Sequence, residues 1–195
     1  MSSFLYCLNS STIKPTPILE KIRIAARAGY AGIELGHKFP REAARLRPIL
    51  DRHGLALVSG WYSSHLLTRD AAVEFAAMRP HLDLLRAMGC DVLILAETSN
   101  AIHGDQAVSL RERPVLPDQD WPLFTARLTE LAGMVRAAGL RIAYHHHMGT
   151  IVQSAEDIGR LMTGTGPDLS LLLDTGHAAF AGADPVALAR RHRGR

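Results

Sequence analysis

Six short apolar runs divide the chain, and each is followed by a longer segment with amphipathic helical spacing. The runs are continuous rather than alternating, which is typical of parallel strands buried on both faces of a sheet. They comprise residues 4–8, 31–35, 55–59, 91–97, 140–145 and 169–174. The helical segments comprise about 15–28, 40–53, 70–88, 120–138, 154–163 and 184–192. This alternation predicts an α/β fold with a parallel sheet.

The predicted helices carry recognisable start and stop signals. Glycine ends several of them, in the segments AARAGY, DRHGL, RAMGCD and RAAGLR, where it supplies a left-handed turn. Asp70, Asp120, Ser154 and Asp184 stand at predicted helix starts, where a side-chain oxygen can cap the helix. Pro185 follows Asp184 and suits a first helical position.

Two architectures fit this order of elements, an open doubly wound sheet and a (β/α)8 TIM barrel. No G-x-G-x-x-G follows the first run, so a dinucleotide-binding fold loses its main support. Polar and titratable residues gather where the strands end, which is the active-site face of a barrel. We therefore favour a barrel with about six βα units.

The barrel is expected to be incomplete. A full barrel takes roughly 250 residues, whereas this chain has 195. We expect residues 1–195 to form a single barrel domain that is truncated before a seventh strand. Three interpretations remain open: a fragment of a longer gene product, a homo-oligomer in which a second chain closes the sheet, or an open barrel with weakened catalysis. Unpaired apolar strand edges invite association. We nevertheless favour truncation, because the sequence stops where a seventh strand should begin and no substitute element appears.

Composition and charge narrow the function classes. The chain is 47% hydrophobic and 21% charged, as in an ordinary soluble domain. Its net charge of +3 is scattered, which argues against a nucleic-acid partner. The sequence shows no signal peptide and no run long enough to cross a bilayer, so we expect a cytoplasmic protein without a membrane partner. Cys7 and Cys90 lie in or beside apolar runs and are expected to be reduced core residues.

The segment YHHHMGT, residues 144–150, places three histidines at the end of the fifth predicted strand. Side chains alternate along a strand, so His145 and His147 should share one face, while His146 points the other way and needs its own hydrogen-bond partner. Neutral imidazole is a good ligand for zinc, manganese, cobalt or iron. A single histidine here is more often structural, but three in a row favour a metal or catalytic role.

The next strand end, LLLDTGH, brings Asp174 and, three residues later, His177. A carboxylate from one strand and an imidazole from its neighbour can bind a divalent cation together. His177 fits a second-sphere or substrate contact. Glu97, which ends the fourth strand, fits a base or a further ligand, and it begins a long loop of residues 97–119 that contains His103.

Other polar residues at strand ends are open to two interpretations. Glu34 and His37 fit a solvated loop and a substrate contact equally well. Trp61 and Tyr62 follow the third strand, where they could stack on a sugar ring or seal the barrel top, and sealing is favoured slightly. His65 lies in the same group of strand-end residues.

Several of these motifs resemble a known group. AARAGYAGIEL resembles the second-strand signature of the xylose-isomerase-like TIM-barrel superfamily of sugar isomerases and epimerases. Within it, SGWYS together with YHHHMGT and LLLDTGH resembles the myo-inosose-2 dehydratases. The resemblance covers essentially the whole chain, but only about the first two-thirds of a family member.

The resemblance implies one divalent metal, Mn²⁺ or Co²⁺, held by residues from strands five to eight. His145 takes the strand-five position, where the wider superfamily often has glutamate and the dehydratase branch has histidine. Asp174 matches the strand-six aspartate, and His177 its neighbouring histidine. The ligands of strands seven and eight have no counterpart here. We therefore assign metal binding to His145 and Asp174.

The implied activity is a carbon–oxygen lyase reaction, in which 2-keto-myo-inositol (inosose) loses water through an enediolate during inositol catabolism. Glu97, His147 and His177 are candidates for proton transfer or hydroxyl contacts, and Glu34, Trp61 and His65 for substrate binding. The alternatives are a sugar or hydroxypyruvate isomerase, a polyol-ketone epimerase, and a non-catalytic remnant that only binds the polyol ketone.

Overall fold

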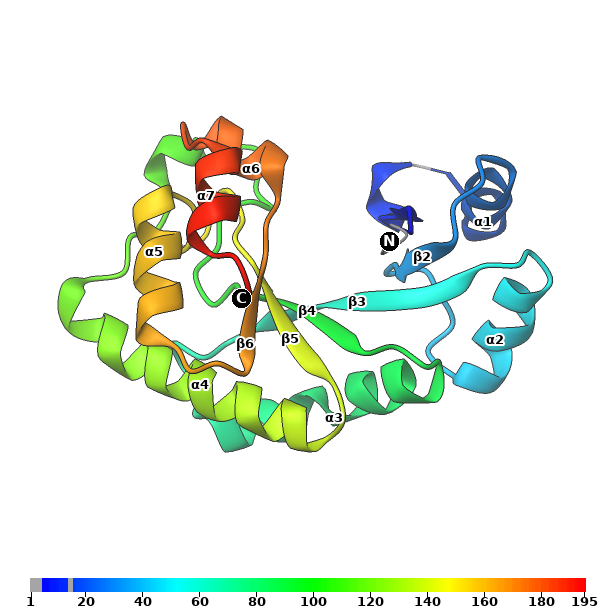
Figure 1. Ribbon diagram of the computed structural model, residues 1–195, viewed down its shortest axis with the longest axis horizontal. Helices are drawn as coiled ribbons and strands as arrows, with labels where there is room; N and C mark the ends of the chain where they lie inside the picture. The colour runs from blue at the N-terminus through cyan, green and yellow to red at the C-terminus, as the bar shows by residue number, and fades with distance from the viewer. Residues whose placement is uncertain (1–4, 14–15) are drawn as a thin grey trace. The chain divides into compact units, whose positions relative to one another are not determined.

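The computed structural model describes residues 5–13 and 16–195 and shows a parallel sheet of six strands (Figure 1). The strands follow one another in the order β1-β2-β3-β4-β5-β6. They are β1 (Cys7–Leu8), β2 (Gly32–Leu35), β3 (Ala56–Ser64), β4 (Val92–Glu97), β5 (Arg141–His145) and β6 (Leu169–Leu172). This order is that of a barrel in which each strand pairs with its neighbour in the chain, and it differs from a doubly wound sheet, whose order reverses.

Helices connect these strands. They are α1 (Ile18–Arg27), α2 (Ala43–Asp51), α3 (Ala71–Ala87), α4 (Trp121–Ala137), α5 (Ala155–Gly164), α6 (Thr175–Phe180) and α7 (Pro185–Arg191). Three short 3₁₀ helices accompany them, η1 (Ser10–Thr12), η2 (Leu110–Glu112) and η3 (Asp118–Asp120). The predicted alternation of strand and helix is confirmed, and α6 is the one α-helix of the described residues that the sequence pattern missed.

Most of the predicted helix boundaries are confirmed. The four glycines after α1, α2, α3 and α4 all have positive φ, between 64° and 91°. The side chains of Asp70, Ser154 and Asp184 each accept a backbone N–H in the first turn of their helix. The prediction for Asp120 is wrong, because Asp120 already has helical backbone angles and makes no capping bond. It belongs to η3, which runs directly into α4, so it lacks the extended backbone from which a capping side chain accepts the first N–H groups of a helix.

Several strand boundaries also differ from the prediction, and β6 ends at Leu172, two residues before the end of the predicted run. The first strand begins at Cys7, and Phe4 of the predicted run lies outside the described residues. The third strand extends to Ser64. Trp61 and Tyr62 therefore lie within β3 and do not follow it. The hydroxyl of Tyr62 donates to the buried Glu74 carboxylate at 2.8 Å. This bond satisfies the polar end of the Tyr62 side chain within β3.

The chain divides into two compact units, which we describe separately. Unit 1 comprises the described residues of 1–61 together with 79–93. There β2 pairs in parallel with β1 and β3, and Gly32 stands opposite both Cys7 and Ala56. Cys90 is buried and Cys7 is exposed, so the prediction of two core thiols holds only for Cys90. Cys7 differs because β1 is a two-residue strand that has a neighbour only in β2.

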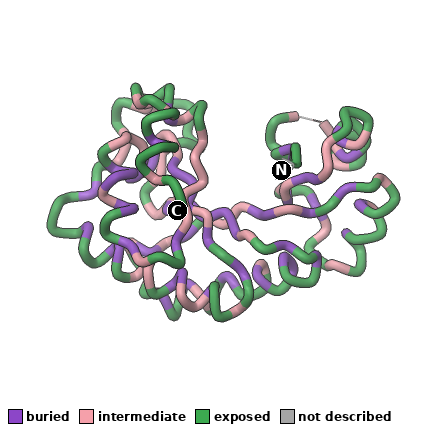
Figure 2. The backbone as a smooth tube through the Cα atoms, in the orientation of Figure 1, coloured by how far each residue is buried: buried purple, intermediate pink, exposed green. Residues whose placement is uncertain are grey.

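Unit 2 comprises residues 62–78 and 94–195. Strands β5 and β6 pair in register from Ile142 opposite Leu169 to His145 opposite Leu172. Buried residues lie along β5 and on one side of α4 and α5, whereas most of β6 is half-buried (Figure 2). Tyr144 is fully buried in this core. The three histidines that follow it therefore lie at the end of a closely packed strand. No helix among the described residues is long and apolar enough to span a membrane.

Candidate metal centre

His145, Asp174 and His177 form a cluster in unit 2. Their nearest ligand atoms all lie within 4.8 Å of one another. His145 ends β5, Asp174 precedes α6, and His177 lies in its first turn. The Oδ2 atom of Asp174 lies 3.3 Å from Nε2 of His145 and 3.7 Å from Nε2 of His177. The predicted pair of ligands is thus brought together, and His177 joins it.

The two carboxylate oxygens of Asp174 face different partners. Oδ1 accepts the backbone N–H of His177 at 2.8 Å and caps α6, which leaves Oδ2 for the imidazoles. The backbone N–H of Asp174 donates to Nε2 of His146 at 3.2 Å. His145 at the end of β5 and His146 directly after it therefore contact two different groups of one aspartate, the carboxylate and the backbone N–H. The fully buried His146 thereby gains a hydrogen-bond partner of its own.

His147 lies on the same side of the cluster as His145. Its ring centroid is 5.4 Å from that of His145 and 4.2 Å from that of His177. Nδ1 of His147 lies 2.8 Å from the carbonyl oxygen of Met148. Because a carbonyl can only accept, Nδ1 carries the proton and Nε2 the lone pair in the neutral ring. His147 is thus set up as a proton acceptor through Nε2.

The protonation states suit a cation site. Burial lowers the pKa of His145 and of His146 to about 4, with neighbouring imidazoles adding to the effect. Burial also lowers the pKa of His177. Partial burial raises the pKa of Asp174, but the N–H of His177 and the nearby imidazoles outweigh it and bring the pKa below its usual value. At neutral pH the cluster therefore offers neutral imidazole nitrogens beside an ionised carboxylate.

Acidification is expected to lower the free energy of unfolding of the metal-free chain. The pKa values of His145 and His146 are about 4 in the folded chain and 6.5 in the reference state. The unfolded chain therefore binds protons first as the pH falls, so this contribution is complete above about pH 6.5 and is lost toward pH 4. Urea unfolding over this range measures the slope. His145→Gln should reduce the slope relative to the wild type, and an unchanged slope in this variant would contradict the account.

Glu97 is buried and fully engaged. Its Oε2 accepts the Ser64 hydroxyl at 2.9 Å and the Leu66 N–H at 2.7 Å. Its Oε1 accepts the Ser99 N–H at 2.8 Å and also the Ser99 hydroxyl. The carboxylate thus joins the end of β3 to the loop after β4. This geometry favours a structural role, and proton transfer by Glu97 stays a prediction.

The three predicted substrate contacts lie at or near the ends of β2 and β3. In unit 1, burial raises the pKa of Glu34 to about 7, and the Asn9 amide donates to its carboxylate at 3.4 Å. Trp61 is half-buried within β3. His65 follows β3, and its carbonyl accepts the N–H groups of Thr68 and Arg69. A substrate role for these residues stays a prediction.

His103 lies at this cluster, although no role for it was predicted from its place in the sequence. It comes from the long loop after β4, and its ring centroid lies 4.6 Å from that of His147. Burial, together with His147 and His177, lowers its pKa. The length of this loop was a signal that it covers a site, but spacing alone could not select which of its residues reaches the histidines.

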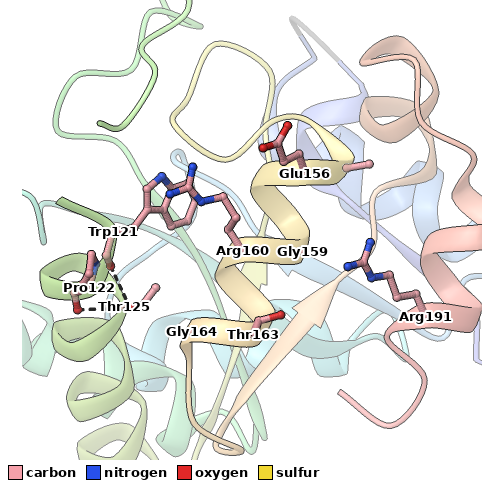
Figure 3. Close-up of a pocket in the computed structure, with 10 residues that line it drawn as sticks. Trp121, Pro122, Thr125, Glu156, Gly159, Arg160, Thr163, Gly164 and Arg191 are labelled. Atoms are coloured by element: carbon pink, nitrogen blue, oxygen red, sulfur yellow. Dashed lines mark hydrogen bonds between the residues drawn. The ribbon is translucent and has the colours of Figure 1, made fainter. Parts of the chain in front are cut away.

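A separate cavity of about 800 Å³ lies between α4, α5 and α7 of unit 2 (Figure 3). The guanidinium of Arg160 stacks on Trp121 at 4.7 Å from the ring centroid and pairs with Asp118 at 2.7 Å. Arg191 of α7 lines the opposite side. None of the predicted site residues lines this cavity, so it is distinct from the histidine cluster.

A family model described as "Xylose isomerase-like TIM barrel" matches residues 22–194. The chain belongs to this family. The barrel-type fold with six βα units is therefore confirmed.

Two solved structures support the fold. A family 2 AP endonuclease from Brucella melitensis superposes with a TM-score of 0.73 at 19% identity, over 98% of this chain and 76% of that one. The IolI protein, solved with a bound zinc atom, has a TM-score of 0.65 at 16% identity, over 93% and 66%. Identities this low show the fold alone.

Curated relatives of this xylose isomerase-like chain are more similar in sequence. The rhizopine catabolism protein MocC of Rhizobium meliloti is 45% identical over 91% of this chain and 54% of its own length. The inosose dehydratase of Lacticaseibacillus casei is 40% identical over 86% and 57%. That of Geobacillus thermodenitrificans is 37% identical over 86% and 57%. The resemblance to inosose dehydratases is confirmed, and the chain spans a little over half the length of these relatives.

Proposed function

We propose that this chain carries the metal centre of a hydro-lyase that removes water from inosose in inositol catabolism. The observation that carries the proposal is the cluster of His145, Asp174 and His177, with ligand atoms within 4.8 Å of one another. It occurs in a chain that is 36–40% identical to several inosose dehydratases. Since the chain spans only part of those proteins, we infer the activity from the residues of the cluster and do not transfer it from the relatives.

The residues of the cluster fit a divalent cation. Two imidazole nitrogens and one carboxylate oxygen form a mixed donor set of the kind that manganese, cobalt and zinc accept. A ligand imidazole must be neutral, and the pKa of about 4 for His145 meets that condition at pH 7. Asp174 has its pKa below the usual value and supplies the negative charge. We infer that His145 and Asp174 hold Mn²⁺ or Co²⁺, with His177 as a third ligand or a contact to the substrate.

A dehydration of this kind needs three contributions. A bound divalent cation would supply Lewis acidity that polarises the ketone of the substrate. A base removes the α-proton to give an enediolate, and an acid protonates the β-hydroxyl that leaves as water. The chain must therefore place at least one proton-transferring side chain beside its ligands.

His147 is the best placed of the three candidates for proton transfer. The Met148 carbonyl fixes its tautomer, so that Nε2 presents a lone pair. Its ring lies 4.2 Å from that of His177, centroid to centroid, and His177 in turn lies beside Asp174. Glu97 is less suited, because both of its oxygens already accept hydrogen bonds. We assign the base to His147 and keep His177 for a hydroxyl contact or proton donation.

Product mass tests the proposed reaction. The purified chain is incubated with inosose and either Mn²⁺ or Co²⁺, with a chelator-treated sample as control. A product lighter by one water, formed only with metal, is the expected result. A product of unchanged mass would indicate an isomerase or epimerase instead. A folded, metal-loaded chain that gives no product would support the non-catalytic interpretation.

A second candidate substrate follows from the comparison with MocC. That protein is named for rhizopine catabolism, and its identity of 45% exceeds the 40% of the L. casei inosose dehydratase. The same site would then act on a compound of rhizopine breakdown. Offering inosose and rhizopine side by side to the metal-loaded chain separates the two candidates by which of them is consumed.

A further inference from the structure

The loop after β4 is fastened to the histidine segment after β5. The N–H of Ile102 donates to the carbonyl of Gly149 at 2.9 Å. The N–H of Gly149 in turn donates to the side-chain oxygen of Gln153 at 2.8 Å. At its start the loop is held by the N–H of Thr98, which donates to the Ser64 carbonyl at 2.9 Å. Two backbone bonds from separate strand ends therefore fix the path of the loop.

Gly149 is required at this junction for two independent reasons. Its φ of +73° lies in the left-handed region, which residues other than glycine adopt only with strain. A Cβ atom built at this position would also lie 2.9 Å from the backbone nitrogen of His103 and 3.2 Å from its Cα. The missing side chain thus lets the backbone of residues 102–103 approach the segment that carries the metal-site histidines.

The result of this approach is a row of imidazoles. The ring of His103 lies 4.6 Å from that of His147, which lies 4.2 Å from that of His177. The ring of His177 stacks on that of His145 at 5.3 Å. His103 is the exposed end of the row, and His145 is its buried end at the metal ligands. A ligand that touches the cluster would meet His103 at its solvent side.

We propose that His103 is a substrate-binding residue, which Gly149 positions to contact a hydroxyl of the polyol ketone on the side away from the metal ligands. A neutral imidazole offers one donor and one acceptor, and so does a ring hydroxyl, so the two are complementary. This inference rests on the proposed function, because it takes its ligand class from there. It adds a residue that lies on neither of the strands supplying the metal ligands.

The test measures binding of myo-inositol, which has the ring hydroxyls but no ketone, to the chain loaded with Mn²⁺. His103→Ala is expected to weaken this binding roughly three- to tenfold, as the loss of one hydrogen bond does. Mn²⁺ affinity, measured in the same preparations, should stay within about twofold of the wild type, because His103 is not a ligand. Gly149→Ala is expected to act in the same direction by displacing the loop.

Gly104→Ala is the matched control, because a Cβ there meets nothing within 4 Å. It should bind myo-inositol as the wild type does. The double variant His103→Ala/Gly149→Ala should be no weaker than the weaker single variant, since both changes remove one contact. Wild-type binding by His103→Ala, or equal binding by Gly149→Ala and Gly104→Ala, would overturn the inference alone. If the Mn²⁺-loaded wild type binds no myo-inositol, the polyol site and the proposed function fall with it.

Discussion

Asp174→Asn is expected to weaken Mn²⁺ binding by about a hundredfold or more, since loss of a ligand should exceed the 10- to 100-fold cost of losing an outer-shell partner. Oδ1 of Asp174 caps α6 through the His177 N–H, and an asparagine oxygen can keep that bond. The change therefore removes the charge and the proposed ligand atom Oδ2, which lies 3.3 Å from Nε2 of His145 and 3.7 Å from Nε2 of His177. Titration calorimetry with Mn²⁺ measures the loss.

Asp184→Asn is the matched control for this experiment. Asp184 caps α7 by accepting the Val186 N–H at 2.8 Å, but it does not belong to the histidine cluster. Both variants keep a capping oxygen, so a difference between them isolates the ligand function. Equal Mn²⁺ affinity in the two variants would show that Asp174 is only a helix cap.

Glu97→Ala is expected to lower the free energy of unfolding by about 3–5 kcal/mol, because it leaves several buried or half-buried donors without an acceptor. These donors are the Ser64 hydroxyl, the Leu66 N–H and the Ser99 N–H. Glu97 is 1% exposed and Leu66 is fully buried, so water cannot easily replace the carboxylate. Urea unfolding of the metal-free chain measures the change.

Glu130→Ala, an exposed change in α4, is the control and should alter stability by less than about 0.5 kcal/mol. The loss of stability in Glu97→Gln should lie between those of the two alanine variants. The amide keeps one acceptor oxygen, but its NH₂ group is a donor that faces the other donors. A Glu97→Ala chain as stable as Glu130→Ala would contradict the structural role. It would return Glu97 to the group of candidates for proton transfer.

The sequence predicted the repeating architecture well because its signals are local. Continuous apolar runs located all six strands, and glycines such as Gly139 marked the helix ends where positive φ is needed. The pairing of His145 with Asp174 was also predictable, because neighbouring parallel strands bring their ends together. Two short motifs in consecutive βα units were enough to place these groups side by side.

The features that the sequence missed depend on tertiary contacts. Glu97 stands at a strand end like a catalytic residue, and only its four donors show that it joins loops. His103 is one polar residue among many in a long loop, and its approach to His147 follows from the docking of Ile102 on Gly149. Asp120 failed as a cap because η3 precedes α4 without a break. No local pattern encodes these contacts.

The most direct test of the central claim is an anomalous-scattering map of the chain crystallised with Mn²⁺. The account predicts one strong peak within coordination distance of Oδ2 of Asp174 and Nε2 of His145, with His177 beside it. A peak bound by other residues, or a well-ordered cluster of these three side chains with no ion between them at saturating Mn²⁺, would contradict it.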